Sequence, residues 1–213
     1  MKKTVLLFAA VILCTLRLQA QQSSGFGLGP FIGVKACVNA ADIPQGTKTG
    51  LSFNGMPDIG VTLFVPFSKE SSTATNYDLA YSTYSIKSRP ESGDTDDNTI
   101  ITYSNYITLG PSINFGGFMV GANIGIPVGA SMSNVSGSIK ASASSTEGMA
   151  IITELRIGGM IPVMRNELGR LNFVVIGGYM INGMDNGYSS SYNPKAASLM
   201  MGFNFLLNFQ RAE

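Results

Sequence analysis

A run near the end of the chain alternates between two kinds of residue. Every second position is large and apolar: Leu199, Met201, Phe203, Phe205, Leu207 and Phe209. The positions between them are mostly polar. A period of two is the repeat of a β-strand whose two faces differ. A strand of this kind can lie in a bilayer only when its apolar face meets lipid and its polar face meets a lumen, so the pattern restricts the chain to β-sheet and favours a closed barrel.

The same period-two template gives eight candidate strands over the whole chain. They cover residues 26–38, 57–67, 76–87, 100–111, 116–128, 148–163, 171–184 and 196–210. We find no Asp, Glu, Lys or Arg on the proposed outer face. In a barrel, an exposed Lys or Arg near the bilayer midplane costs roughly 2–4 kcal/mol, whereas a soluble sandwich carries charges on its solvent face. We therefore predict an all-β fold, an eight-stranded antiparallel up-and-down transmembrane β-barrel.

The connections between the candidate strands alternate in length. Those after the first, third, fifth and seventh strands are long and polar, and those after the second, fourth and sixth are short. Barrels of the outer membrane show this pattern, with long outer loops and short periplasmic turns. The predicted outer loops lie near residues 39–56, 88–98, 129–147 and 185–195.

The start of the chain predicts export. Lys2 and Lys3 precede an apolar run from Val5 to Leu13, and Ala20 offers a small residue at a cleavage point. The run is much shorter than the roughly 20 residues that span a bilayer as a helix, so a cleaved secretory signal fits better than an anchor. We expect a signal peptide over 1–20 and a single barrel domain over 21–213.

Composition weakens most enzymatic interpretations. The chain has no histidine, so a Ser-His pair and an imidazole zinc site are both impossible. Its formal net charge of +1 gives no basic surface for nucleic acid. We expect no enzyme activity, no catalytic residue, no cofactor, no metal site and no nucleic-acid partner.

Five charged residues fall on the predicted inner face: Lys35, Asp58, Asp78, Glu154 and Arg156. Two interpretations compete. In the first they form a polar network that fills the barrel, because eight strands leave an interior about wide enough for side chains alone. In the second they line a narrow conduit and select small solutes. The bulky Phe31, Phe64 and Met119 on the same face favour the filled interior.

Three segments resemble a known family. The stretch Gly29–Lys35, the segment Tyr106–Pro111 and the alternating terminal strand are similar to small outer-membrane β-barrel proteins of Gram-negative bacteria, including the PorT-like group. The resemblance implies a closed barrel in the outer membrane, surrounded by lipid and inserted by the assembly machinery. One departure is the tail after Phe209, since many such proteins end on an aromatic residue.

We therefore expect a monomeric, non-enzymatic protein of the cell outer membrane, with a structural or surface-interaction role through its long loops. A narrow passive porin for small solutes is the first alternative. A soluble periplasmic binding barrel of the lipocalin type is the second. The sequence identifies no particular solute, ligand or protein partner.

Overall fold

The computed structural model describes residues 25–68, 71–143, 145–186 and 192–209. The predicted signal peptide over 1–20 lies outside these ranges. The described residues contain β-strands, turns and loops. Among them, no helix is long and apolar enough to cross a membrane.

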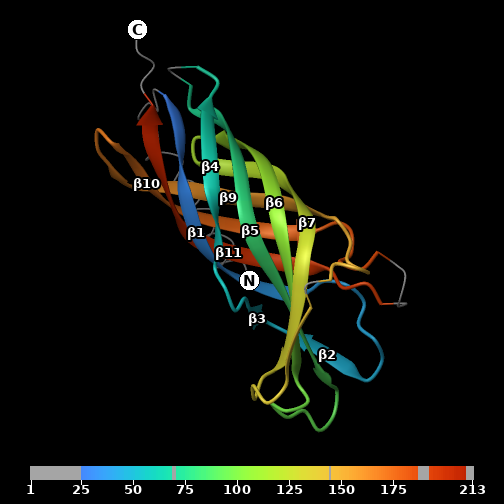
Figure 1. The fold of residues 1–213 in the computed structure, drawn as a ribbon. Coiled ribbons are helices and arrows are strands. Elements are labelled where there is room, and N and C mark those ends of the chain that lie inside the picture. The colour runs from blue at the N-terminus through green and yellow to red at the C-terminus, as the bar shows by residue number, and fades with distance from the viewer. Residues whose placement is uncertain (1–24, 69–70, 144, 187–191, 210–213) are drawn as a thin grey trace, which may run out of the picture.

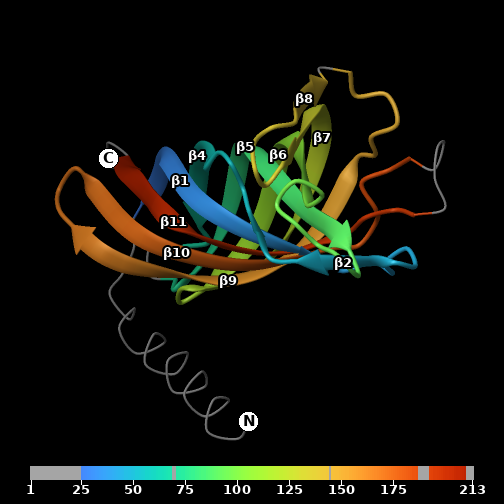
Figure 2. The same ribbon diagram turned by 90° about the horizontal axis from the view of Figure 1, so that it is seen from below.

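Eight long strands form a closed ring (Figures 1 and 2). They are β1 (Phe26–Asn39), β4 (Asp58–Pro66), β5 (Thr73–Pro90), β6 (Ile100–Phe115), β7 (Phe118–Asn134), β9 (Ile152–Arg165), β10 (Gly169–Met180) and β11 (Ala196–Phe209). Each pairs antiparallel with the next along the chain, and β11 pairs with β1 from Phe26↔Phe209 to Asn39↔Ala196. The last pairing closes the sheet on itself and confirms the predicted eight-stranded antiparallel barrel.

The connections gather by length at the two ends of the ring. The described residues of the short connections, 67–68, 71–72, 116–117 and 166–168, lie at one end, the turn end, at the top in Figure 1. The described parts of the longer connections between the ring strands, 40–57, 91–99, 135–143, 145–151, 181–186 and 192–195, lie at the other end, the loop end. Gly116 and Gly117 have φ values of 58° and 98°, which a tight two-residue hairpin turn requires and which glycine adopts without strain.

Three short strands correct the predicted extent of the loops. Within the expected loop 39–56, β2 (Thr47–Gly50) pairs with β5 and β3 (Ser52–Phe53) pairs with β1. Within the expected loop 129–147, β7 continues to Asn134 and β8 (Lys140–Ala143) pairs with it. These segments have two to four residues, which is too short for a hydrophobic period to find them.

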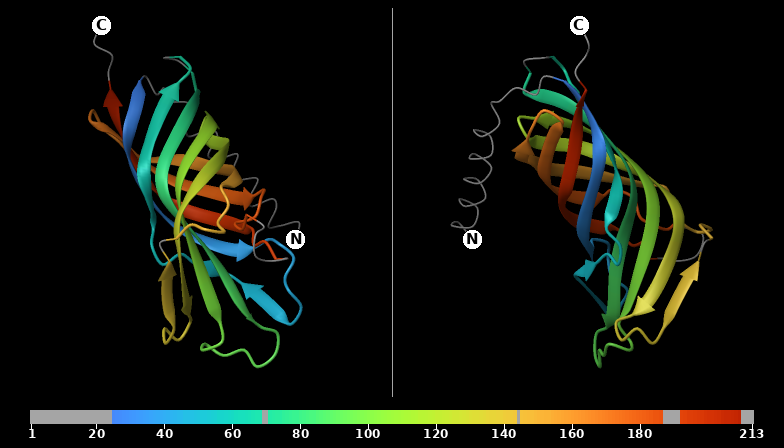
Figure 3. Two further views of the ribbon diagram at one scale, coloured as in Figure 1. Left: turned by 45° about the vertical axis from the view of Figure 1, so that its right-hand side comes forward. Right: turned by 60° about the vertical axis from the view of Figure 1, so that its left-hand side comes forward.

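Past the ring, the loop-end parts of β5, β6 and β7 continue as a sheet that projects beyond the other strands (Figure 3). The strand β2 lies beside β5 on one side of this projection, and β8 lies beside β7 on the other. We call this five-stranded part, in the order β2-β5-β6-β7-β8, the loop-end sheet. It gives the loop end a wall on one side of the barrel.

The outer face is apolar around the whole ring, as the alternation predicts. In β11 the side chains of Leu199, Met201, Phe203, Leu207 and Phe209 are exposed, while Met200, Gly202, Asn204 and Leu206 between them are buried. The other ring strands contribute further exposed apolar side chains: Leu28, Ile32, Val34, Ile59, Val61, Leu63, Tyr77, Leu79, Ile107, Leu109, Ile113, Val120, Ile124, Ile126, Leu155, Ile157 and Tyr179. We call this set the apolar belt.

The expectation of an outer face without charge holds in the belt but not at the strand ends. Lys87 and Arg89 fall on the outer side of β5 by the alternation of the strand, beyond the belt toward the loop end. Arg165 is exposed where β9 ends at the turn end. Lys87 is the last residue of the predicted third strand, 76–87, so the prediction of a charge-free outer face is wrong at that strand end.

Candidate functional site in the barrel interior

The five predicted charged residues all point into the barrel. Lys35 comes from β1, Asp58 begins β4, Asp78 lies on β5, and Glu154 and Arg156 lie on β9. Each occupies an inward position of its strand, and none is more than 9% exposed. Charged groups this deeply buried are costly unless they are paired and hydrogen-bonded, so their partners decide what the site can do.

The first pair joins neighbouring strands. The Lys35 ammonium lies 2.6 Å from a carboxylate oxygen of Asp58 and 3.9 Å from the centre of the Tyr84 ring. The Ser82 hydroxyl donates to the same Asp58 oxygen at 3.0 Å, and the backbone N–H of Thr83 donates to the other oxygen at 3.2 Å. Asp58 therefore neutralises a buried cation and also ties the start of β4 to β5.

The second pair crosses the lumen. Arg156 donates from a guanidinium nitrogen to Asp78 at 3.1 Å, although β9 and β5 are not neighbours in the ring. The Thr62 hydroxyl donates to the second oxygen of Asp78 at 2.7 Å. Arg156 reaches across because Gly110 carries no side chain: a Cβ there would overlap the guanidinium.

The fifth charge, Glu154, is held by neutral donors. The Tyr84 hydroxyl donates to it at 2.8 Å, the Ser198 hydroxyl at 2.8 Å and the Asn123 side-chain amide at 3.3 Å. A Cβ at Gly178 would overlap this carboxylate, so the glycine makes the room that Glu154 occupies. Together the two ion pairs and Glu154 form one layer of charged groups across the interior, which we call the ionic layer.

Apolar side chains close the interior on both sides of the ionic layer. The cluster toward the loop end contains Cys37, Tyr84, Ile86, Tyr106, Ile152, Met180, Met184 and Ala196. The cluster toward the turn end contains Phe64, Ala74, Met119, Met160, Val174, Ile176, Met200 and Leu206, with Phe31 packed against it. Phe31, Phe64 and Met119 therefore lie inside, as the sequence indicated.

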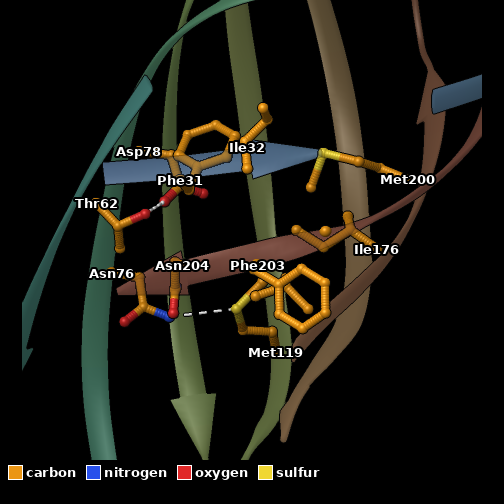
Figure 4. A pocket seen from close by; sticks show the side chains of 12 residues that line it. Phe31, Ile32, Thr62, Asn76, Asp78, Met119, Ile176, Met200, Phe203 and Asn204 are labelled. Atoms are coloured by element: carbon orange, nitrogen blue, oxygen red, sulfur yellow. Dashed lines mark hydrogen bonds between the residues drawn. The ribbon is translucent and has the colours of Figure 1, made fainter. Parts of the chain in front are cut away.

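Two cavities between these groups are small. One cavity, lined by Phe31, Asn76, Asp78, Met119 and Asn204 among others, leaves about 20 Å³ for the centre of a water-sized sphere (Figure 4). A second, inside the ionic layer, leaves about 10 Å³. A single water molecule needs roughly 10–15 Å³ by this measure. Each cavity is therefore about large enough for one water molecule, and neither is wide enough for a hydrated ion.

The sequence predicted the charged residues of the ionic layer but did not single out their neutral partners. All five partners lie at inward positions of predicted strands: Thr62, Ser82, Tyr84, Asn123 and Ser198. Their positions in the alternation are enough to place them on the inner face. Their connections depend on pairing register, which the sequence does not give. Among the described residues, no group of three or more Cys, Asp or Glu side chains is placed to hold a metal ion.

Comparisons with known proteins add little to this description. No family model and no curated protein sequence matches the chain. Among solved structures, the chain is similar to the outer membrane protein OprG from Pseudomonas aeruginosa, with 13% sequence identity and a TM-score of 0.33 over 90% of this chain and 99% of that chain. A likeness at this level carries no weight for function.

Proposed function

We propose that this chain is an integral β-barrel protein of the bacterial outer membrane that acts as a filled, non-conducting scaffold. The observation that carries the proposal is the distribution of charge and apolar surface. The apolar belt surrounds all eight ring strands, while Lys35, Asp58, Asp78, Glu154 and Arg156 are buried inside. A barrel in water would gain by the opposite arrangement.

A lipid environment explains the belt physically. Apolar side chains that are 40–60% exposed, such as Ile32 at 52%, Leu79 at 51% and Ile157 at 57%, recur on neighbouring strands around the ring. A continuous apolar surface of this extent would drive aggregation in water. In a bilayer the same surface is satisfied by lipid, and the closed ring leaves no unpaired backbone edge in the hydrocarbon.

The filled interior supports a scaffold over a channel. Two ion pairs satisfy four of the five charges, three neutral donors satisfy Glu154, and an apolar cluster lies on each side. A conducting pore needs a continuous wet path. With the interior filled, the side chains that a partner could reach are those of the long loops and the loop-end sheet. The role of the protein is therefore structural, or it lies in contacts at the cell surface.

The proposal also includes the expectations drawn from the sequence. The chain carries a signal peptide removed near Ala20, is inserted by the outer-membrane assembly machinery, is a monomer surrounded by lipid, and belongs near the PorT-like group. It has no enzyme activity. In this orientation the turn end faces the periplasm and the loop end faces the cell exterior.

The test is insertion followed by single-channel recording. The mature chain refolded into phosphatidylcholine vesicles should migrate differently on gels before and after heating, resist protease across its ring strands, and give no steady conductance in planar bilayers. Glu154→Gln and Arg156→Gln should insert less stably without opening a channel. Steady wild-type conductance that either substitution alters would contradict the filled scaffold and support the narrow porin. A mature chain that stays monomeric in water without detergent would contradict the membrane location.

A further inference from the structure

We propose that the outer side of the loop-end sheet carries a binding site for the phosphate groups of anionic lipids in the outer leaflet. This inference rests on the proposed membrane location. The site is formed by Lys48 on β2 with Lys87 and Arg89 on β5, and we call these three residues the basic cluster.

Strand register brings the basic cluster together. Lys48 lies directly opposite Arg89, and Gly50 lies opposite Lys87. Residues opposite each other in a sheet point to the same face, and residues two apart on one strand do so as well. A Cβ on Gly50 would lie 3.8 Å from the Lys87 side chain, which agrees with this shared face. Three positive side chains therefore point outward from adjacent strands.

The face they share is the outer side of β5. On β5 the alternation that sends Tyr77 and Leu79 into the belt also places Lys87 and Arg89 on the outer side, beyond Thr83 and Ser85, which are buried on that side. On β6, Tyr103 lies opposite Ser85 of β5. Tyr103 also comes close to Gly55, in the segment that covers the outer side of the loop-end sheet. The inward side of the same strand instead holds Ile86 in the loop-end apolar cluster.

The basic cluster lies beyond the apolar belt toward the loop end, with Lys87 nearest to the headgroup layer. Between Tyr81 and Lys87, a strand that rises ~3.3 Å per residue at a tilt of ~45° moves roughly 14 Å toward the loop end. The headgroup region on each side of the hydrocarbon is roughly 5–8 Å thick. Lysine and arginine stems can extend along the wall to bring their charges to that layer.

The charges of the basic cluster are incompletely compensated within the protein. Lys48 and Arg89 stand directly opposite each other, an arrangement that destabilises a sheet unless an anion lies nearby. Arg89 pairs with Asp94 at 3.0 Å, and both side chains are partly exposed at 38% and 42%. In the part of the chain that the structure describes, no carboxylate forms an ion pair with Lys48 or Lys87. Two lysines therefore remain for an external anion.

Of the acidic residues in the connection after β5, Asp94 pairs with Arg89, and Asp96 and Asp97 lie farther out. Asp94, Asp96 and Asp97 belong to the connection 91–99, whose backbone contacts Asn134 and Ser136 at the tip of β7. From the belt outward the order is thus apolar, basic and acidic. Phosphate-bearing lipid headgroups, which present negative charge next to the hydrocarbon, complement this order, whereas an acidic protein in solution would meet the acidic tip first.

The experiment uses the mature chain in vesicles and a local fluorescent probe. The chain contains no tryptophan, so Ile107→Trp, opposite Tyr81 in the belt below the basic cluster, gives a single emitter. Vesicles of phosphatidylcholine receive increasing amounts of phosphatidic acid with brominated acyl chains, or of brominated phosphatidylcholine as reference. Quenching gives the association constant of each lipid next to the probe, and their ratio is the selectivity.

We expect the wild type to select phosphatidic acid over phosphatidylcholine. In the triple variant K48Q/K87Q/R89Q this selectivity should fall at least about fivefold, because each basic residue at a membrane surface changes the association constant of an anionic lipid by a factor of roughly that size. Asp94→Asn should raise the selectivity, because it frees Arg89. Lys140→Gln, which removes an exposed lysine from β8 farther from the belt, should change it less than about twofold. High salt should abolish the wild-type preference.

The outcomes separate this proposal from the membrane location. Wild type that inserts but shows equal association of both lipids, or a triple variant that inserts and keeps full selectivity, overturns the binding site and leaves the barrel proposal intact. A probe at Ile157→Trp on β9, away from the basic cluster, should show a selectivity that the triple variant does not alter. If the wild type does not insert, the membrane location fails, and the lipid site fails with it.

Discussion

Removing the negative charge of Asp58 tests whether the ionic layer is sealed from water. Asp58→Asn keeps the size of the side chain but leaves the Lys35 ammonium without its counter-ion, at 2.6 Å from a neutral group. Both side chains are almost fully buried, at 4% and 2% exposure, so solvent cannot replace the lost charge. Breaking one partner of a buried pair costs about 3–5 kcal/mol. We expect the free energy of unfolding to fall by about 4 kcal/mol.

The matched control removes the same charge from an exposed pair. Asp94→Asn breaks the contact with Arg89, whose partners are 38% and 42% exposed. Exposed pairs contribute about 0–1 kcal/mol, so this variant should unfold within about 1 kcal/mol of the wild type. The double variant K35M/D58N removes the stranded cation and should recover about 2 kcal/mol of the loss, as an interaction energy in a double-mutant cycle.

The measurement is urea unfolding of the refolded barrel in detergent micelles or vesicles. Far-ultraviolet circular dichroism reports the loss of β-sheet, since the chain has no tryptophan to follow. Equal denaturant slopes for all variants would show that the transitions compare the same states. If Asp58→Asn and Asp94→Asn cost the same small amount, water reaches the Lys35–Asp58 pair, and the reasoning that leads to a filled interior is refuted.

Two further pairs of variants test the inner and outer faces. Gly178→Ala should lower the urea midpoint strongly, because the new Cβ overlaps the Glu154 carboxylate. Gly177→Ala is the control and should be tolerated, because its Cβ faces outward and lies 3.7 Å from the nearest atom. Equal midpoints for the two variants would mean that Glu154 is not fixed in place. Ile157→Lys, in the belt, should destabilise the inserted barrel by roughly 2–4 kcal/mol. Ile139→Lys in the β7–β8 connection, a side chain of similar exposure at 51%, should change stability by less than about 0.5 kcal/mol, and similar losses in both would contradict the position of the belt.

The sequence predicted the ring because its period survives in most strands. In β11 and β1 the outward positions are apolar almost without exception, so a template of period two located both strands to within a residue. In β6 the apolar outward residues from Ile107 to Phe115 show the alternation, although the predicted strand ended at 111, short of Phe115. The first half of β6, which the prediction included, and the end of β5 near Arg89, which it missed, show no such alternation, because these parts lie beyond the belt and neither face must be apolar there.

The ionic layer was only partly predictable. Inward parity identified Lys35, Asp58 and Arg156 individually, since parity follows from the strand alone. The partner of Arg156 could not be inferred, because Asp78 lies on a strand that is not its neighbour and the contact depends on the curvature of the whole ring. Apart from Phe31, Phe64 and Met119, the members of the apolar clusters were missed for another reason: the hydrophobic period marks the lipid face, and inward residues such as Ile152 interrupt it.

The two ion pairs differ in how much of the barrel must exist before they can form. Lys35 and Asp58 lie on consecutive ring strands, so a hairpin of β1 and β4 with β5 beside it already holds the complete contact. The contact between Asp78 and Arg156 spans the lumen between residues 78 positions apart in the chain, and the Ser198 bond to Glu154 requires the last strand. The Lys35–Asp58 pair can therefore form in an N-terminal folding intermediate. The Asp78–Arg156 contact and the Ser198–Glu154 bond complete the ionic layer only when the ring closes.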